Sequence, residues 1–316
     1  MLPHITLTRP IFDDQITALR ARCQLTLGTN PGPYGEAELM RLLKGAQGAI
    51  ISLREPVTAR VLDACPDLKV ISNIAVGYNN IDVPACTARG IVVTNTPDVL
   101  TQTTADFAWA LLMAAARRLP EAERYLREGR WQHWSLDQLT GKDVYGATLG
   151  IVGMGRIGAA IAARAAGFGM RVQYHNRKPS LDAAGASYCV SLDDLLRSSD
   201  YVVLVVPYGA ATHHLIGAAQ IARMRADAVL VNIARGGVVD DAALIAALKS
   251  GHLHSAGLDV FEGEPALNKG YLDIPNVVLT PHIASSSLAT RRAMAQLAVD
   301  NCLDVLDGGA SLNRVN

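Results

Sequence analysis

The stretch Leu149-Gly150-Ile151-Val152-Gly153-Met154-Gly155-Arg156-Ile157-Gly158 decides how this chain folds. Residues 148–152 are mostly apolar and predict a buried strand, whereas the alanine-rich residues 157–167 predict a helix that follows directly. A second strand, predicted over residues 170–174, begins at the distance expected for a strand–helix–strand unit. A glycine turn in this context indicates a dinucleotide site, and an ordinary strand–helix turn is the alternative.

Each glycine of this turn has a separate physical role. Gly153 permits a tight turn, Gly155 lets a pyrophosphate approach the backbone, and Gly158 lets the helix pack closely on the strand. The first free N–H groups of the helix then face the anion at the positive end of the helix dipole. The residues expected to contact the cofactor here are Gly153, Met154, Gly155, Arg156, Ile157 and Gly158.

Composition excludes several classes of protein. Half of the 316 residues are apolar, which is typical of a globular protein with two cores. The chain carries no net charge, so its charge does not indicate binding to nucleic acid or to a membrane surface. The first residues resemble a strand rather than a signal peptide, so a cytoplasmic location is expected. The five cysteines are scattered and form no CxxC pair, so we expect neither a disulfide framework nor a metal site.

The rest of the chain predicts two α/β domains. Short apolar runs alternate with helical segments over residues 4–95, which favours a parallel sheet covered on both faces. A long helical segment is expected from Thr101 to Gly129, followed by a loop in which Trp131 and Trp134 either pack or contact a partner or substrate. Residues 145–283 predict six strands in a doubly wound, Rossmann-type sheet. The last helix is expected to return to the first domain, which assigns residues 1–99 and 287–316 to one domain and 100–286 to the other.

The end of the second strand of this sheet bears on the choice of nicotinamide cofactor. A site for NAD uses an acidic side chain about twenty residues past the glycines, to bind the ribose 2′-hydroxyl. Asn176 occupies that position, and Arg177 and Lys178 follow it. A guanidinium binds a 2′-phosphate that a carboxylate would repel. The segment therefore predicts NADP(H), with a solvated basic loop as the alternative.

Three residues on successive loops predict the chemistry. Arg235, Glu264 and His282 each follow a predicted strand, and ligands of open α/β sheets bind at the carboxyl ends of the strands. Each of these three residues, taken alone, could have a purely structural role. Together they match the needs of ketone reduction by hydride: a cation that holds a carboxylate and polarises the carbonyl, and a proton donor whose charged form a carboxylate favours.

Over almost its whole length the sequence resembles the D-isomer-specific 2-hydroxyacid dehydrogenases. The matching stretches are Ala75–Asp82, Asn95-Thr96-Pro97, the glycine turn, Asn232–Gly236, Ala256–Phe261, Glu264-Pro265 and Pro281-His282. Within the family, Tyr174–Lys178 and Gly257–Pro265 are most similar to the NADPH-preferring glyoxylate/hydroxypyruvate and 2-ketogluconate reductases. The departures, at Ala75, Asn79 and Ala284–Ser286, remove no chemical group from the expected mechanism.

The resemblance implies a flavodoxin-like substrate domain beside the cofactor domain, and a role for individual residues. His282 would be the acid/base paired with Glu264, and Arg235 would bind the substrate carboxylate and carbonyl. Asp259 and the Ile233 carbonyl would orient the nicotinamide. Further cofactor contacts are expected at Asn176, Arg177, Lys178, Val206, Pro207, Thr212, Ala234, Arg235, His282 and Ala284. Substrate contacts are expected at Leu53, Val76, Gly77, Arg235 and His282.

These observations predict a homodimeric, NADPH-dependent reductase that converts a small 2-keto acid to the D-2-hydroxy acid. Glyoxylate, hydroxypyruvate and 2-ketogluconate are the candidate substrates, and aromatic pyruvates remain an alternative. A nicotinamide-sensing co-regulator with the same architecture also stays open, because an intact Arg235, Glu264 and His282 set does not exclude it.

Overall fold

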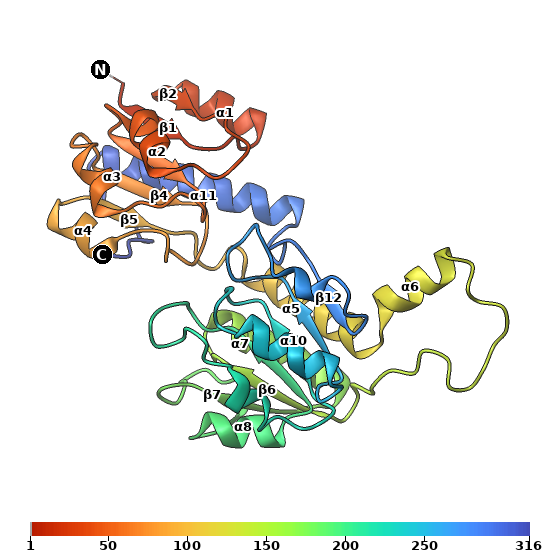
Figure 1. Cartoon of the computed structure of the whole chain (residues 1–316). Helices are drawn as coiled ribbons and strands as arrows, with labels where there is room; N and C mark the ends of the chain where they lie inside the picture. The colour runs from red at the N-terminus through yellow and green to blue at the C-terminus, as the bar shows by residue number, and fades with distance from the viewer. Residues whose placement is uncertain (1) are drawn as a thin grey trace. The chain divides into compact units, whose positions relative to one another are not determined.

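The computed structural model describes residues 2–316, which form two compact units (Figure 1). Among the described residues, the first unit comprises residues 2–100 and 286–316, and the second comprises Thr101–Ser285. Both units are parallel sheets flanked by helices, so the α/β, doubly wound fold class predicted from the sequence is confirmed.

The first unit is built on a five-stranded parallel sheet of order β2-β1-β3-β4-β5. Its strands are β1 (His4–Leu7), β2 (Gln24–Leu27), β3 (Gly48–Ile51), β4 (Val70–Asn73) and β5 (Val92–Thr94). Its helices are α1 (Asp13–Arg20), α2 (Glu36–Leu43), α3 (Ala59–Asp63), α4 (Val83–Ala88) and α11 (Leu288–Leu306). Helix α11 packs on β3, β4 and β5, and its Ala298, Cys302 and Leu303 join Ile5 and Leu7 in one core cluster.

The second unit is built on a seven-stranded parallel sheet of order β12-β11-β10-β9-β6-β7-β8. Its strands are β6 (Thr148–Val152), β7 (Arg171–His175), β8 (Ser187–Tyr188), β9 (Tyr201–Leu204), β10 (Val229–Asn232), β11 (Ser255–Leu258) and β12 (Val277–Leu279). Its helices are α5 (Thr101–Ala116), α6 (Leu119–Arg127), α7 (Arg156–Ala165), α8 (Leu192–Ser198), α9 (Ala218–Ile221) and α10 (Asp241–Lys249). Single 3₁₀ turns span Ala166–Phe168 and Lys269–Tyr271. Apolar cores lie on both faces of the sheet, as the continuous apolar runs of its strands require.

Two expectations for this unit were wrong in detail. The expected six strands are seven, because β8 adds two residues beside Gln173 and Tyr174 of β7 and is too short to show a pattern in sequence. The helix expected from Thr101 to Gly129 is two helices. Arg118 adopts a left-handed conformation with φ 52°, and Pro120 lies in the first turn of α6, where the lack of a proline N–H is tolerated.

Candidate functional site

The glycine turn joins β6 to α7 as the sequence predicts. Gly153 has φ 107°, and a Cβ there would lie 2.6 Å from the carbonyl oxygen of Val205. A Cβ on Gly158 would lie 2.3 Å from the carbonyl oxygen of Gly153, so only glycine lets α7 pack this closely. A Cβ on Gly155 would meet no atom within 4 Å. Gly155 therefore borders open space at the start of a helix, which is the arrangement that accommodates a phosphate group.

Asn176, at the end of β7, is bonded to this turn. Its Oδ1 accepts a hydrogen bond from the Met154 N–H at 2.7 Å, and its backbone carbonyl accepts one from the Tyr188 hydroxyl at 3.1 Å. The next two residues, Arg177 and Lys178, are exposed. The position where an NAD site places a carboxylate is therefore occupied by a neutral side chain that ties β7 to the turn, with two cations directly beyond it.

In the loop after β9, the Thr212 side chain forms hydrogen bonds to two other residues of the loop. The Thr212 hydroxyl donates to the Pro207 carbonyl at 2.8 Å and accepts from the Gly209 N–H at 2.9 Å. Val206 packs partly against the core of the unit. After β10, Ile233 and Ala234 are buried, and the Ala234 N–H donates to Asn232 Oδ1 at 3.0 Å. These expected cofactor residues lie at the carboxyl ends of neighbouring strands.

His282 and Glu264 form a hydrogen-bonded pair. His282 Nδ1 lies 2.8 Å from Glu264 Oε2, and each side chain is about one-fifth exposed. Glu264 Oε1 accepts from the Phe261 N–H at 2.8 Å, so both of its oxygens are held. Burial raises the pKa of Glu264, but the hydrogen bond and charge of His282, the Phe261 N–H and Arg235 outweigh burial, and the pKa falls below its ordinary value. Glu264 is therefore an ionised partner for the imidazole.

Arg235 lies on the turn that follows β10, next to the segment that carries Glu264. Its Nη1 donates to the Ala234 carbonyl at 2.8 Å, and its own carbonyl accepts from Asn232 Nδ2 at 3.2 Å. A Cβ on Gly236 would lie 1.8 Å from the Phe261 carbonyl oxygen, so the turn and this segment are in direct backbone contact. Burial lowers the pKa of Arg235, and the negative charge of Glu264 opposes this decrease. The guanidinium remains charged in either case.

Asp259 anchors the turn that presents His282. Its buried carboxylate accepts from the N–H groups of Ile283 and Ala284, each at 2.8 Å, and from the Thr280 hydroxyl at 2.7 Å. Its carbonyl accepts from the His282 N–H at 2.9 Å. His282 is left-handed, with φ 55°, which is uncommon for a residue other than glycine. Burial raises the pKa of Asp259 although these donors oppose the increase.

The expected substrate residues Leu53, Val76 and Gly77 lie in the first unit and are half-buried. The carbonyls of Val76 and Gly77 accept from Asn95 Nδ2 and Asn73 Nδ2, each at 2.9 Å, so this loop is held in one conformation. The structure brings Arg235, Glu264 and His282 together within the second unit.

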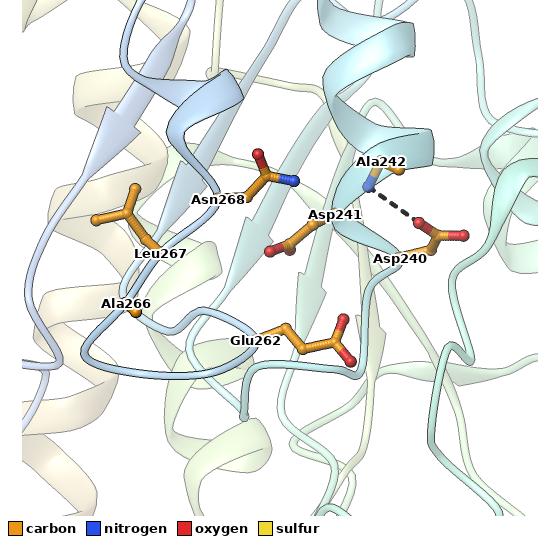
Figure 2. Close-up of a pocket in the computed structure, with 7 residues that line it drawn as sticks. All are labelled: Asp240, Asp241, Ala242, Glu262, Ala266, Leu267 and Asn268. Atoms are coloured by element: carbon orange, nitrogen blue, oxygen red, sulfur yellow. Dashed lines mark hydrogen bonds between the residues drawn. The ribbon is translucent and has the colours of Figure 1, made fainter.

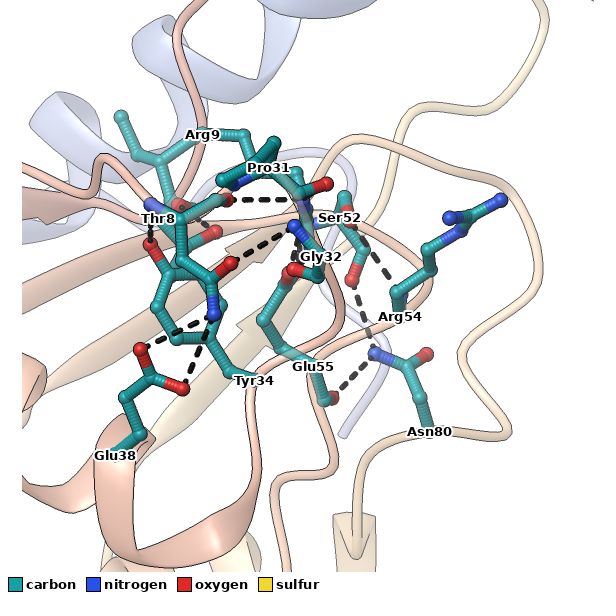
Figure 3. Close-up of polar contacts among 12 residues, drawn as sticks. Thr8, Arg9, Pro31, Gly32, Tyr34, Glu38, Ser52, Arg54, Glu55 and Asn80 are labelled. Atoms are coloured by element: carbon teal, nitrogen blue, oxygen red, sulfur yellow. Dashed lines mark hydrogen bonds and ion pairs between the residues drawn. The ribbon is translucent and has the colours of Figure 1, made fainter. Parts of the chain in front are cut away.

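An ion pair between the partly exposed Arg9 and the buried Glu55 supports the loop that contains Leu53 (Figure 3). Arg9 Nε donates to Glu55 Oε1 at 2.8 Å, and the fully buried Glu55 accepts from the Ser52 N–H at 2.6 Å through its other oxygen. Asn80 Nδ2 donates to the carbonyls of Ser52 and Glu55 at 3.1 and 3.0 Å. Sequence reasoning missed this network, because Arg9, Glu55 and Asn80 are far apart in sequence. It also missed the anchoring role of Asn232, although Asn232 lies in a motif it had singled out.

Comparison with known proteins gives one consistent family. Residues 109–284 match the model of the D-isomer specific 2-hydroxyacid dehydrogenase, NAD binding domain. The chain is 47% identical to a glyoxylate reductase of Korarchaeum cryptofilum, over 100% of this chain and 96% of the relative. It is 42% identical to glyoxylate/hydroxypyruvate reductase B of Klebsiella pneumoniae, over 100% and 99%.

A solved structure agrees with these sequence matches. The NADPH-dependent glyoxylate/hydroxypyruvate reductase of Sinorhizobium meliloti, in complex with NADP and malonate, superposes with a TM-score of 0.90 at 37% identity and covers 100% of this chain and 97% of its own. The chain therefore belongs to the D-isomer-specific 2-hydroxyacid dehydrogenase family. None of the helices in residues 2–316 has the length and apolar character needed to cross a membrane.

Proposed function

We propose that this protein reduces a small 2-keto acid to the D-2-hydroxy acid with NADPH. Glyoxylate and hydroxypyruvate are the first candidates, and 2-ketogluconate is a larger one. The observation that carries the proposal is the His282–Glu264 pair at 2.8 Å beside the half-buried guanidinium of Arg235. NADPH supplies a hydride when it is bound, and the groups of the chain supply binding, orientation and the proton.

The proton comes from His282 in this proposal. Glu264 holds Nδ1 of the ring, so Nε2 is the atom that gives its proton to the keto oxygen. The ionised Glu264 favours the charged imidazole, which must be protonated before each reduction. Arg235 holds the carboxylate of the keto acid and polarises its carbonyl, because a guanidinium offers two parallel donors.

The preference for NADPH rests on the segment beyond β7. Asn176 places no negative charge near the 2′ position, and its amide oxygen is already directed to Met154. Arg177 and Lys178 are exposed directly after it and offer charge-assisted hydrogen bonds to a 2′-phosphate. The proposed cofactor domain is residues 100–286, and the glycine turn fits a pyrophosphate since Gly155 borders open space.

Residues 1–99 with 287–316 form the proposed substrate domain. The N–H groups of Val76 and Gly77 are the proposed substrate donors of this domain, and Leu53 is its proposed apolar contact to the substrate. The hydrogen bonds on both carbonyls of the Val76–Gly77 loop support a preorganised donor pair. The ion pair of Arg9 with the buried Glu55 gives the Leu53 loop similar support.

We also propose a homodimer whose interface includes α6. This helix has no buried residue, and its Leu119, Ala122 and Leu126 recur at helical spacing. Leu119 and Leu126 are more than half exposed, as are Trp131 and Trp134 in the loop that follows. Figure 1 shows α6 and this loop extending from the sheet of their own unit. An apolar face of this kind is typical of a surface that another chain covers.

A panel of keto acids tests the proposed reaction. Glyoxylate, hydroxypyruvate, 2-ketogluconate and phenylpyruvate, each with NADPH and with NADH, are followed at the nicotinamide absorbance. We expect turnover of a small keto acid, with kcat/KM higher for NADPH than for NADH. Tight NADPH binding without turnover of any of the four would reject the reductase and favour a nicotinamide-sensing protein.

A further inference from the structure

Three metal-ligand side chains meet outside the proposed catalytic set. His213, His214 and Glu262 each offer one ligand atom, and these atoms all lie within 4.8 Å of one another. His214 Nε2 is 3.2 Å from Glu262 Oε2, and the two imidazole rings are stacked with their centroids 4.0 Å apart. Glu262 is far from the histidines in sequence, so no local sequence motif marks this cluster.

The histidines are held by their surroundings. His213 Nδ1 is 3.1 Å from the Tyr208 hydroxyl, an outer contact of the kind that orients a metal-binding imidazole. His214 has φ 48°, and its N–H donates to the Gly237 carbonyl at 2.7 Å. Two residues later, Ile216 forms a parallel bridge with Val239. The His213–His214 segment is therefore fixed against the loop that leads to α10.

The electrostatic surroundings favour a cation. Glu262 also lines an acidic cavity of about 370 Å³ together with Asp240 and Asp241 at the start of α10 (Figure 2). The Tyr271 hydroxyl donates to Asp241 at 2.9 Å. A positive ion at Glu262 would reduce the repulsion among these three carboxylates.

We propose that His213, His214 and Glu262 form a binding site for a divalent transition-metal ion of the zinc class. Two imidazole nitrogens and one carboxylate oxygen are a donor set that suits zinc, nickel or copper, whereas magnesium and calcium prefer oxygen ligands alone. A bound ion links the loop after β9 to the segment after β11. Because Glu262 lies two residues before Glu264, the ion restrains the segment that carries the partner of His282.

Titration of the chelator-treated full chain with Zn²⁺ alone, by calorimetry, tests the site. We expect one equivalent to bind, and we expect His213→Gln, His214→Asn and Glu262→Gln each to weaken binding by about tenfold or more, since even an outer contact is worth about 10–100-fold. Asparagine is chosen for His214 because it tolerates the left-handed backbone. His133→Gln, an exposed histidine outside the cluster, is the matched control and should bind as the unaltered chain does.

Thermal unfolding gives a second readout that is independent of activity. Zn²⁺ should raise the Tm of the unaltered chain and of His133→Gln, and this increase should disappear when His213→Gln and Glu262→Gln are combined. No binding by the unaltered chain would overturn the proposal. Equal binding by all variants would overturn it too, because the ion would then sit elsewhere, for example at the partly exposed Cys189.

Discussion

At the scale of single residues, His282 combines a polar function with an uncommon backbone conformation. The left-handed φ of 55° is held by a hydrogen bond from its N–H to the Asp259 carbonyl, while the ring is held by Glu264. Position and orientation are thus set by different neighbours. Substituting Asp259 should therefore affect the backbone position of His282 most, whereas substituting Glu264 should affect the orientation of its ring most.

Replacing His282 removes the proposed proton donor. His282→Asn, in which asparagine tolerates the left-handed backbone, should lower kcat by about 10²–10⁴-fold, the usual effect of losing a positioned general acid. The dissociation constant of NADPH, measured by fluorescence, should stay nearly the same, because most of the proposed NADPH contacts do not involve His282. An unchanged kcat would reject His282 as the acid.

Replacing Glu264 tests the coupling of the pair through the pH profile. The lowered pKa of Glu264 keeps its carboxylate ionised near neutral pH, where it favours the protonated imidazole. In Glu264→Gln the neutral amide places no negative charge beside the ring. The pH profile of kcat/KM for reduction, measured across roughly pH 5 to 8, should therefore differ from that of the unaltered chain. An unshifted profile would argue against the coupling.

Replacing Arg177 tests the cofactor preference. Arg177→Ala should raise KM for NADPH much more than KM for NADH, because only NADPH carries the 2′-phosphate. Arg171→Ala is the matched control, since Arg171 is an exposed arginine at the opposite end of β7. Equal changes in both KM values for Arg177→Ala would refute the 2′-phosphate contact.

At the scale of elements, the glycine turn and the residues proposed for the chemistry lie where four of the strands end. The turns after β6, β10, β11 and β12 supply the glycines, Arg235, Asp259 with Glu264, and His282. Parallel strands bring these ends to one edge of the sheet, and backbone contacts then join the turns. Gly236 permits the closest of these contacts, at Phe261.

Asp259 should have the largest structural effect among the turn residues. Asp259→Asn replaces one acceptor oxygen by an NH₂ group that faces an N–H or hydroxyl donor, so a buried donor loses its partner. We expect a loss of about 1–3 kcal/mol in the free energy of unfolding, measured in urea, and a lower kcat because the His282 turn loosens. Asp273→Asn, at an exposed aspartate of the same unit, should change neither value.

At the scale of the whole molecule, the chain forms two compact α/β units, and the second unit includes α6, a helix with no buried residue. Helix α6 begins with Pro120 in its first turn, where Arg118 breaks the longer helix. The break therefore separates a buried helix, α5, from an exposed one.

The proposed dimer is tested by the mass in solution. Light scattering should give the unaltered chain twice the mass of one chain. The double variant Leu119→Lys and Leu126→Lys should give the mass of one chain, because two charges would be desolvated at the interface. Leu181→Lys changes an exposed leucine elsewhere in the second unit and should remain dimeric. A single-chain mass for the unaltered protein would reject the dimer.

Much of the fold could be predicted because the information is local. The apolar runs at 148–152 and 201–204 predict strands, and the glycine turn predicts the strand–helix junction, since both depend on residues adjacent in sequence. The family and the α/β class predicted from these motifs are confirmed. The two-residue strand β8 and the break at Arg118 escaped prediction, because neither has a periodic pattern.

The sequence by itself determined the class of fold, the family and the three polar residues proposed for the chemistry, because each depends on short motifs whose residue types have a direct physical reason. Only the tertiary structure decided which groups meet. It placed Glu264 2.8 Å from His282 and directed the Asn176 side chain toward the Met154 N–H. It also bonded Asp259 to the turn that carries His282, and brought His213 and His214 close to Glu262. These contacts join residues far apart in sequence, which only the folded sheets bring within hydrogen-bonding distance.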